Sequence, residues 1–349
     1  MKILFCGDIH WNETTSILRK YGESGKTLRL ENLIESVNWV EKLAEDSYCD
    51  RIIYGGDFFD KSVISAMEIT ALQEVKWSGI NHYFMVGNHE GLMNDLSTSS
   101  AHLFNMVPNS KVIDRPLLET GFGYRFLYLP YILENDRKSL KDYFKDLLTC
   151  NIETQEVKLP YVFSHNDIKM YYGRFESKEG FEVSDIEKSC VYFLNRHLHN
   201  ESKFCKNGYN VGNLTGQNFS EDGFNYKHQV AILDTNTQEL KWVENPFAYY
   251  FYKLEISSIE DLNLNILKSN SVVTVRAPES LVNEVRSILE TNSKIKEFRV
   301  ITVVNKDNKG VEEELSLETV NHLDEFIKFV KENLEANDLV LSELSEVCK

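Results

Sequence analysis

Residues 51–60 read Arg-Ile-Ile-Tyr-Gly-Gly-Asp-Phe-Phe-Asp, a short apolar run that stops at glycine and aspartate. Continuous apolar runs of this length are typical of buried strands. Four further runs stop in the same way, at a cluster of Gly, Asp, Asn or His: Lys2–Cys6, His82–Val86, Pro160–Phe163 and Cys190–Leu194. Because α/β folds place their sites at the carboxyl ends of strands, the five polar clusters are expected at one edge of a single sheet.

Segments of helical period separate these runs. Apolar residues fall on one helix face over residues 30–44, and Ile69, Leu72 and Val75 mark a second helix. Alternating strands and helices predict a layered α/β domain, to which we assign residues 1–245.

The pattern changes near Asn245-Pro246. Three strand candidates follow, at residues 249–255, 272–275 and 298–304. One helix candidate, at residues 278–291, lies between the second and the third strand. This βαβ-like order predicts a small α+β domain over residues 246–310.

The last segment, residues 311–349, contains 11 acidic and 3 basic residues. Its apolar residues are spaced by 3, 4, 3 and 4, which is an a/d seam over two heptads: Val320, Leu323, Ile327, Val330 and Leu334. The sequence predicts an acidic amphipathic helix that either packs on its own domain or binds a partner.

The whole chain of 349 residues has a formal charge of −16, which argues against a protein that wraps nucleic acid with a broadly basic surface. Local basic faces remain possible because half of the acidic excess lies after residue 310. No apolar run approaches the length of a membrane span or a signal peptide. The six cysteines form no metal-binding or redox motif, so we expect a reducing compartment, the cytoplasm or a host cytoplasm.

The polar clusters carry the candidate chemistry. Each one alone could be an ordinary turn or an exposed strand face. Together they offer carboxylate, amide and imidazole groups at successive strand ends: Asp8, His10, Asp57, Asn88, His89, His165, His197 and His199. This mixed ligand set suits Mn²⁺, Zn²⁺ or Fe²⁺ better than Ca²⁺. Even seven of these eight side chains are too many ligands for one ion, so the sequence predicts two ions and a phosphoester substrate.

The motifs D-x-H, GDxxD, GNH[DE], a lone His after a strand, and HxH follow one another in the order typical of calcineurin-like metallophosphoesterases. Within that superfamily the chain resembles the SbcD-type nuclease subunit of the double-strand-break repair complex, and most of all its bacteriophage recombination-exonuclease version. Gly56-Asp-Phe-Phe-Asp60 is similar to the GDLFD form of those nucleases. The resemblance implies a two-layered β-sandwich flanked by helices, with a DNA-binding capping domain and a C-terminal helical segment.

The resemblance also implies roles for single residues. Asp8, His10, Asp57 and His199 would hold one divalent ion. Asp57, as a bridge, would hold the second ion with Asn88, His165 and His197. His89 would protonate the leaving 3′ oxygen or stabilise the scissile phosphate. Mn²⁺ is the expected metal, with Mg²⁺, Zn²⁺ or Fe²⁺ as alternatives.

Three positions depart from the family pattern. Arg196 and Ser164 stand where glycine is usual before the site histidines, and Glu90 is the third. Arg196 would either distort the site or add a cation for phosphate. Glu90 replaces the more usual Asp, and the resulting Gly-Asn-His-Glu form of the motif also occurs in protein phosphatases. The residues after two other motifs, Trp11 after His10 and Lys61 after Asp60, depart from the phosphatase pattern.

We therefore expect a Mn²⁺-dependent DNA exonuclease and endonuclease that acts in end processing, recombination and repair. A nucleotide or protein phosphatase, or a weakly catalytic subunit that bridges DNA and a partner, are the alternatives. Basic residues in two stretches are candidate phosphate contacts: Arg19, Lys20, Lys26, Arg29, Arg276, Arg286, Lys294, Lys296 and Arg299. The resemblance implies an SbcC-like coiled-coil ATPase partner, bound through residues 318–347, and a homodimer.

Overall fold

In the computed structural model, the described residues are 1–14, 18–121, 123–148, 159–172 and 175–303. The described part of the chain up to Val303 belongs to one compact unit. The helix predicted within residues 311–349 lies outside the described residues.

The first of two large sheets has the strand order β18-β17-β1-β2-β3-β6. Its strands are β1 (Lys2–Cys6), β2 (Arg51–Gly55), β3 (Asn81–Met85), β6 (Ser110–Ile113), β17 (Gln229–Asp234) and β18 (Glu239–Glu244). The four strands β1, β2, β3 and β6 run parallel, whereas β17 is antiparallel to both β1 and β18. The carboxyl ends of β1, β2 and β3 therefore meet at one edge.

The second sheet has the order β15-β16-β14-β9-β8-β7. Its strands are β7 (Leu117–Gly121), β8 (Tyr124–Leu129), β9 (Tyr161–His165), β14 (Tyr192–Arg196), β15 (Ser202–Lys203) and β16 (Gly208–Asn210). Its central strands β8, β9, β14 and β16 are parallel. The expectation of one sheet is therefore wrong, because the five predicted strands divide between two sheets. Apolar runs identify buried strands but do not specify how the strands pair.

Alternation along β1 explains how the sheets stack. Ile3 and Phe5 belong to the core shared with Phe163 of β9 and Leu194 of β14. Leu4 and Cys6 point to the other face and join the core under helix α1 (Leu28–Asp46). Both faces of the first sheet are therefore buried, as a continuous apolar strand requires.

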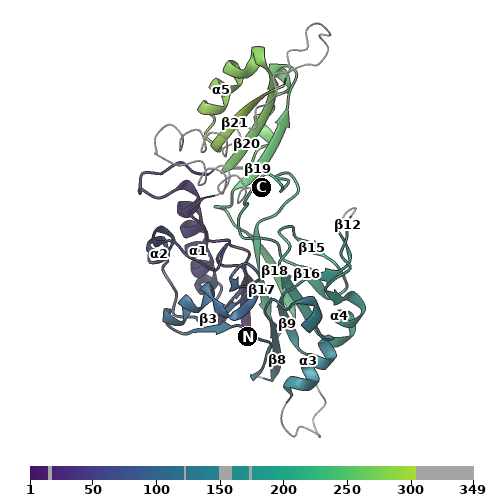
Figure 1. The fold of residues 1–349 in the computed structure, drawn as a ribbon. Coiled ribbons are helices and arrows are strands. Elements are labelled where there is room, and N and C mark those ends of the chain that lie inside the picture. The colour runs from purple at the N-terminus through teal and green to yellow at the C-terminus, as the bar shows by residue number, and fades with distance from the viewer. Residues whose placement is uncertain (15–17, 122, 149–158, 173–174, 304–349) are drawn as a thin grey trace, which may run out of the picture. The chain divides into compact units, whose positions relative to one another are not determined.

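Helices cover the outer faces of the two sheets (Figure 1). Thr27 is the N-cap of α1, and its side chain accepts a hydrogen bond from the backbone N–H of Leu30. A capping box of Ser65 and Glu68 precedes and begins α2 (Ala66–Leu72). On the second sheet, α3 (Leu140–Leu147) and α4 (Val183–Ser189) enclose a third apolar core. The expected α/β architecture of two sheets flanked by helices is confirmed.

A separate sheet of three parallel strands follows, in the order β19-β20-β21. These strands and their helix are β19 (Tyr250–Glu255), β20 (Ser271–Pro278), α5 (Val282–Thr291) and β21 (Ile295–Val303). Val285 and Leu289 of α5 pack with Val273 and Val275 of β20. Phe251 and Val272 point to the opposite face and contact a cluster that includes Phe219 of the preceding fold. We call β19–β21 with α5 the cap, and the boundaries at residues 245 and 310 stay predictions.

Short elements complete the described chain. They are the strands β4 (Gly91–Leu92), β5 (Asp95–Ser99), β10 (Ile168–Lys169), β11 (Tyr171–Tyr172), β12 (Phe175–Glu176) and β13 (Phe181–Glu182), and the 3₁₀ turns Ser100–Met106, Glu134–Asp136, Ile259–Asp261, Leu264–Ile266 and Glu279–Leu281. Among the described residues, no helix combines the length and the apolar character that crossing a bilayer requires.

Candidate metal centre

The predicted ligands come from both large sheets. Asp8 and His10 follow β1, Asp57 follows β2, and Asn88 follows β3. His165 is the last residue of β9, and His197 follows β14 directly. His165 Nε2 lies 3.1 Å from Asp57 Oδ2, so the carboxyl ends of the two sheets meet at this point.

The loops that carry these side chains have an unusual backbone. Asp8, His10, Asp57 and His197 all have positive φ angles, of 46°, 48°, 48° and 111°. Non-glycine residues rarely adopt this region, and such residues often mark functional sites. Hydrogen bonds between the loops hold the conformation, since the N–H groups of Asp8 and His10 donate to the carbonyls of Gly56 and Asp57 at 3.1 and 3.0 Å.

Asp57 lies at the middle of the cluster. Its Oδ1 accepts a hydrogen bond of 3.0 Å from the backbone N–H of His89, and its Oδ2 faces His165. Burial alone would raise the pKa of Asp57, but the charge and hydrogen bond of His165, with His10 and His89 nearby, hold this pKa well below its usual range. A Cβ at Gly87 would overlap the Asp57 carboxylate, which explains the glycine there.

Asn88 joins two histidines through one oxygen. Its Oδ1 lies 3.1 Å from His165 Nε2 and 3.1 Å from His197 Nδ1. The other nitrogen of His165, Nδ1, donates to the Gly55 carbonyl at 2.8 Å, which fixes the ring orientation and directs Nε2 at the oxygens. Burial lowers the pKa of His165, but the Asp57 charge and hydrogen bond raise it more strongly, to about 9.

Two buried atoms at the centre have no hydrogen-bond partner, namely Asp8 Oδ1 and His10 Nε2. His10 Nδ1 lies 2.9 Å from Asp60 Oδ1, which leaves Nε2 for another contact. Unpaired polar atoms in a protein interior cost about 1–3 kcal/mol each, so these two atoms are suited to pairing with a bound group. A carboxylate oxygen and an imidazole nitrogen are both ligands for a divalent transition metal, and the residues present therefore fit the predicted ions.

Two compact groups of candidate ligand atoms share Asp57. One group is Asp8, His10 and Asp57, and the other is Asp57, His165 and His197. Within each group the ligand atoms lie within 4.8 Å of one another. This arrangement agrees with two ions that share one carboxylate.

His199 is outside both groups. Its ring centroid lies 5.1 Å from that of His10, and its Nδ1 is 3.4 Å from Glu221 Oε1. Burial lowers the pKa of His199, but the hydrogen bond to Glu221 and nearby carboxylates raise it to above its usual value.

His89 lies at the rim, with 44% of its side chain exposed. Its Nδ1 is 3.1 Å from the Asp60 carbonyl, to which it can donate, and its ring centroid is 4.8 Å from that of His10. This position beside the candidate ligands and open to solvent suits a group that exchanges protons with a substrate.

Three carboxylates that sequence reasoning did not assign support the histidines. Asp60, Asp167 and Glu221 face His10, His197 and His199, at 2.9, 3.2 and 3.4 Å. Carboxylates in this position orient metal-binding imidazoles and raise their basicity. Asp60 is in the quoted GDxxD motif and Asp167 is two residues after His165, so both could have been found. Glu221 has no local sequence signal.

The Arg196 side chain points into the protein interior and not toward the rim of the site. The side chain is fully buried, and its Nη2 donates to the carbonyls of Phe5 and Gln229 at 3.4 and 3.1 Å. It therefore cannot reach a phosphate at the rim, and the suggestion that it adds a substrate-binding cation is wrong. Gly7, Gly55, the Phe5 ring and Asp8 also lie around the side chain.

The other two unusual positions have structural roles. Ser164 is buried in β9, and its Oγ accepts from Asn166 Nδ2 at 3.1 Å. Glu90 is also buried and accepts from the N–H groups of Gly87 and Phe59 at 2.8 and 3.1 Å, so it fastens two site loops together. Burial raises the pKa of Glu90 to about 7.

Residues 1–219 match the family model described as calcineurin-like phosphoesterase. The chain belongs to this family of metallophosphoesterases. It is therefore a metal-dependent phosphoester hydrolase, and its His and Asp clusters are the groups that could hold the divalent metals that the family uses.

Two solved structures from Thermus thermophilus are similar to the chain. TT1561 is 12% identical with a TM-score of 0.42, and the match covers 70% of this chain and 98% of that one. A hypothetical protein is 13% identical with a TM-score of 0.40, and the match covers 70% of this chain and 100% of that one. A search of curated proteins gave no match.

Proposed function

We propose that this phosphoesterase is a Mn²⁺-dependent DNA exonuclease and endonuclease, the SbcD-type subunit of a complex that processes DNA ends. The observation that carries the proposal is the pair of ligand groups that share Asp57, beside a solvent-exposed His89. Two neighbouring divalent ions provide the charge that a phosphodiester displacement needs at both the attacking and the leaving oxygen.

The chain's own residues have separate tasks in this proposal. Asp8, His10, Asp57, Asn88, His165, His197 and His199 would hold the ions. Asp60, Asp167 and Glu221 keep three of the imidazoles in orientation. His89, which is open to solvent, donates a proton to the leaving 3′ oxygen or binds the scissile phosphate.

The cap supplies local positive charge for the DNA backbone. Lys253, Thr274 and Arg299 are paired across β19, β20 and β21, so their side chains share one face of the sheet, and Arg276 lies two residues along on that face. These residues line a hollow of about 360 Å³ together with Leu254, Glu255 and Ile301. Glu255 is paired opposite Arg276, so the hollow has three cationic side chains and one carboxylate. The Arg299 guanidinium is 4.8 Å from the centre of the Phe219 ring, which joins this face to the metallophosphoesterase domain.

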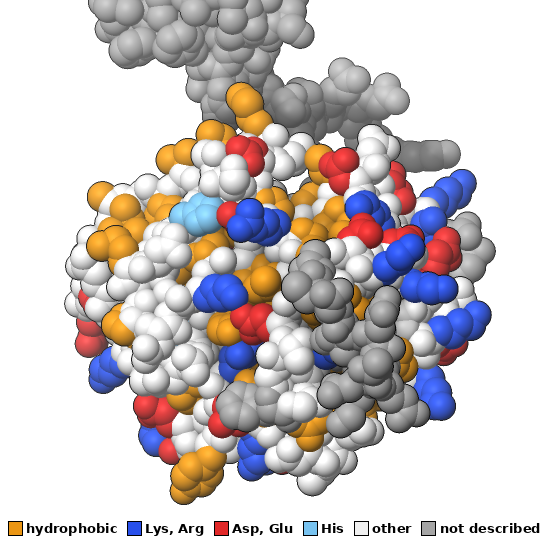
Figure 2. All heavy atoms as spheres, turned by 90° about the horizontal axis from the view of Figure 1, so that it is seen from below, with side chains coloured by type: hydrophobic (Ala, Val, Ile, Leu, Met, Phe, Trp, Pro, Cys, Tyr) orange, Lys and Arg blue, Asp and Glu red, His pale blue; other side chains and the backbone are white. Residues whose placement is uncertain are grey.

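Two of the predicted basic contacts do not offer a free cation on the open surface. Arg29 is buried and donates to backbone carbonyls, and Lys26 pairs with Glu74 at 2.6 Å. On the face shown in Figure 2, basic and acidic side chains of the described residues are interspersed. The cap face is therefore the better candidate for sequence-independent contact with phosphates.

The test is digestion of labelled duplex and single-stranded DNA in the presence of Mn²⁺, compared with hydrolysis of 4-nitrophenyl phosphate. A nuclease cleaves the DNA and acts poorly on the small monoester. Efficient monoester hydrolysis without DNA cleavage would instead support a phosphatase.

We propose an SbcC-type coiled-coil ATPase as the partner, bound through the acidic segment 318–347, and a homodimer as the assembly. Deletion of residues 318–349 should abolish pull-down of such an ATPase while Mn²⁺-dependent cleavage remains. Retained pull-down by the truncated chain would contradict the partner assignment.

A further inference from the structure

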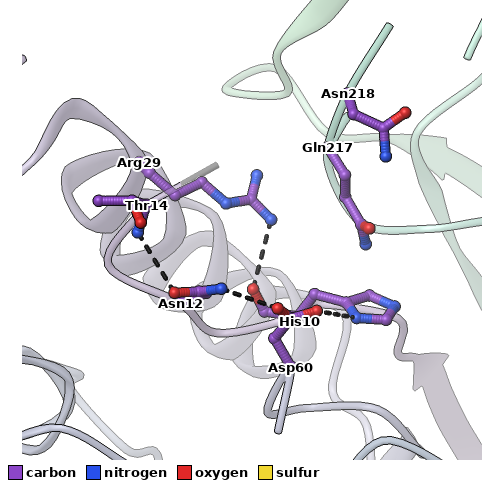
Figure 3. A pocket seen from close by; sticks show the side chains of 7 residues that line it. All are labelled: His10, Asn12, Thr14, Arg29, Asp60, Gln217 and Asn218. Atoms are coloured by element: carbon purple, nitrogen blue, oxygen red, sulfur yellow. Dashed lines mark hydrogen bonds and ion pairs between the residues drawn. The ribbon is translucent and has the colours of Figure 1, made fainter. Parts of the chain in front are cut away.

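A polar pocket of about 270 Å³ lies next to the candidate metal centre (Figure 3). His10 and Asp60 belong to both sites, so the pocket is continuous with the place where a scissile phosphate would bind. The remaining lining residues are Asn12, Thr14, Arg29, Gln217 and Asn218. Figure 3 shows Gln217 and Asn218 on one segment, facing Arg29, Asn12 and His10 on the other.

Arg29 provides a fixed positive charge at this pocket. It extends from the first turn of α1 and is almost fully buried, and its Nη1 donates to the Gly216 carbonyl at 2.8 Å. Its Nη2 donates to the carbonyls of Ile9 and His10 at 3.1 and 3.4 Å. Each terminal nitrogen carries two hydrogens, so Nη1 keeps one for another acceptor, and Nε has no partner.

Gln217 provides a second unused donor. Its side chain lines the pocket, only 8% of the residue is exposed, and its Nε2 has no hydrogen-bond partner. The backbone is fixed because the Gln217 N–H donates to the Glu221 carboxylate at 3.2 Å. Glu221 also faces His199, so one carboxylate positions both the pocket and a candidate metal ligand.

The Asp60, Asn12 and Asn218 side-chain acceptors in the pocket are already engaged. Asp60 Oδ1 and Oδ2 face His10 Nδ1 at 2.9 Å and Asn12 Nδ2 at 2.7 Å. Asn12 Oδ1 accepts from the Thr14 N–H, and Asn218 Oδ1 accepts from the Ser220 N–H. The pocket therefore offers free donors on Arg29 and Gln217 and a buried cation beside the engaged Asp60 carboxylate, which suits a ligand that carries several acceptor oxygens and a negative charge.

We propose that this pocket, formed by Arg29 and Gln217, binds the phosphate adjacent to the scissile one in a polynucleotide chain. The proposal rests on the nuclease function proposed above and specifies its substrate class. A substrate with one phosphate leaves the pocket empty, whereas a polynucleotide fills it. The pocket thus selects phosphodiester chains over isolated phosphoesters.

The test uses the full chain and two variants of Gln217. Gln217→Met removes the donor at similar volume, and Gln217→Glu also adds a negative charge. Binding of a labelled oligonucleotide is measured by fluorescence anisotropy in EDTA. The affinity should fall about 3-fold in Gln217→Met, because a hydrogen bond is lost, and about 10-fold in Gln217→Glu, because a repulsive charge is added. Gln73→Glu, at an exposed residue after α2, adds the same charge elsewhere and should bind like the wild type.

Activity gives the second readout. With Mn²⁺, the ratio of oligonucleotide cleavage to bis(4-nitrophenyl) phosphate hydrolysis should fall about 10-fold in Gln217→Glu, through a higher KM for the oligonucleotide. Unchanged binding in both variants, or an equal loss on both substrates, would overturn the pocket assignment while the nuclease function stands. A wild-type protein that hydrolyses the small diester but neither binds nor cuts DNA would overturn both.

Discussion

In the metal centre, four of the candidate ligands have left-handed backbones and two have buried atoms without partners. In the cap, Asn270 is the one residue with such a backbone between residues 250 and 303, and asparagine tolerates this conformation well. Val273, Val275, Val285 and Leu289 fill an ordinary apolar core there.

The difference shows where each region gets its stability. The cap is stabilised by regular strand pairing and by burial of apolar side chains, each worth about 1.5–3 kcal/mol. The metal centre contains strained residues, unpaired polar atoms and buried charges, which are tolerated because two large sheets hold the loops in place. Bound ions would pair these atoms, so metal should stabilise the metallophosphoesterase domain, by about 2.7 kcal/mol at one hundred times Kd.

The largest effect is expected from Asp57→Asn. The variant lacks the carboxylate that both ligand groups share, so we expect loss of bound metal and of all measurable hydrolysis. Metal content by mass spectrometry and DNA cleavage check this result. Asp46→Asn, at the exposed end of α1, is the matched control and should keep both properties. Full metal content in Asp57→Asn would show that metal binding does not depend on this shared carboxylate, and would contradict the difference described between the metal centre and the cap.

His89→Gln should lower kcat by about 10²–10⁴-fold, the range for loss of a general acid, because His89 lies at the open rim of the site. Metal content should stay at the wild-type value. His102→Gln removes a histidine that faces Asp114 outside the candidate ligand set and should retain activity. Loss of metal from His89→Gln would indicate that His89 is a metal ligand and not a proton donor.

A buried histidine near the junction with the cap should make stability depend on pH. Burial lowers the pKa of His228 to about 4, and its ring is 4.8 Å from that of Tyr250. Between pH 6.5 and 4 the unfolded chain binds a proton here that the folded chain does not. His228 should therefore reduce the free energy of unfolding as pH falls through this window, by about 1.4 kcal/mol per pH unit.

Urea unfolding of the wild type and of His228→Gln at pH 4.5, 5.5 and 6.5 isolates this contribution. Other groups titrate in both proteins, so the difference between the two curves reports His228 alone. The stability of His228→Gln should fall less steeply than that of the wild type as pH decreases. Parallel curves would contradict the effect.

Glu221→Gln should weaken metal binding about 10- to 100-fold, which is the usual effect of removing a carboxylate behind a metal-binding histidine. Titration with Mn²⁺ measures the change. Glu201→Gln removes a carboxylate that pairs with Lys227 outside the ligand set and should bind metal normally. Unchanged metal affinity in Glu221→Gln would leave His199 outside the metal centre.

The smallest effect is expected in the cap. Arg276→Glu should reduce DNA affinity a few-fold and lower the slope of log affinity against log salt by about 1 for each phosphate that the variant no longer binds. Arg286 is an exposed residue of α5, which covers the opposite face of the cap sheet. Arg286→Glu should therefore change neither quantity. Because the cap contains no candidate ligand, metal content should stay constant in both variants. Equal effects of the two substitutions would show that the cap face with Lys253, Arg276 and Arg299 has no special role in DNA binding.

Local sequence was enough to find most elements. Strands β1, β2 and β3 lie within one or two residues of the predicted runs, because apolar runs bounded by Gly, Asp and Asn are a local signal. The boundary of α2 was less accurate, since Val75 fits the helical period but lies beyond the last helical residue, Leu72. Short helices are stabilised by packing, which periodicity does not report.

The sequence by itself determined the ligand chemistry, because residue types such as those in Asp8-x-His10 and His197-x-His199 dictate which metals they can bind. Only the tertiary structure decided that these residues come from two sheets, that Arg196 turns inward, and that Glu221 supports His199. The physical reason is that strand pairing and side-chain direction depend on contacts between segments far apart in the chain. Such contacts leave no periodic trace in the sequence around either partner.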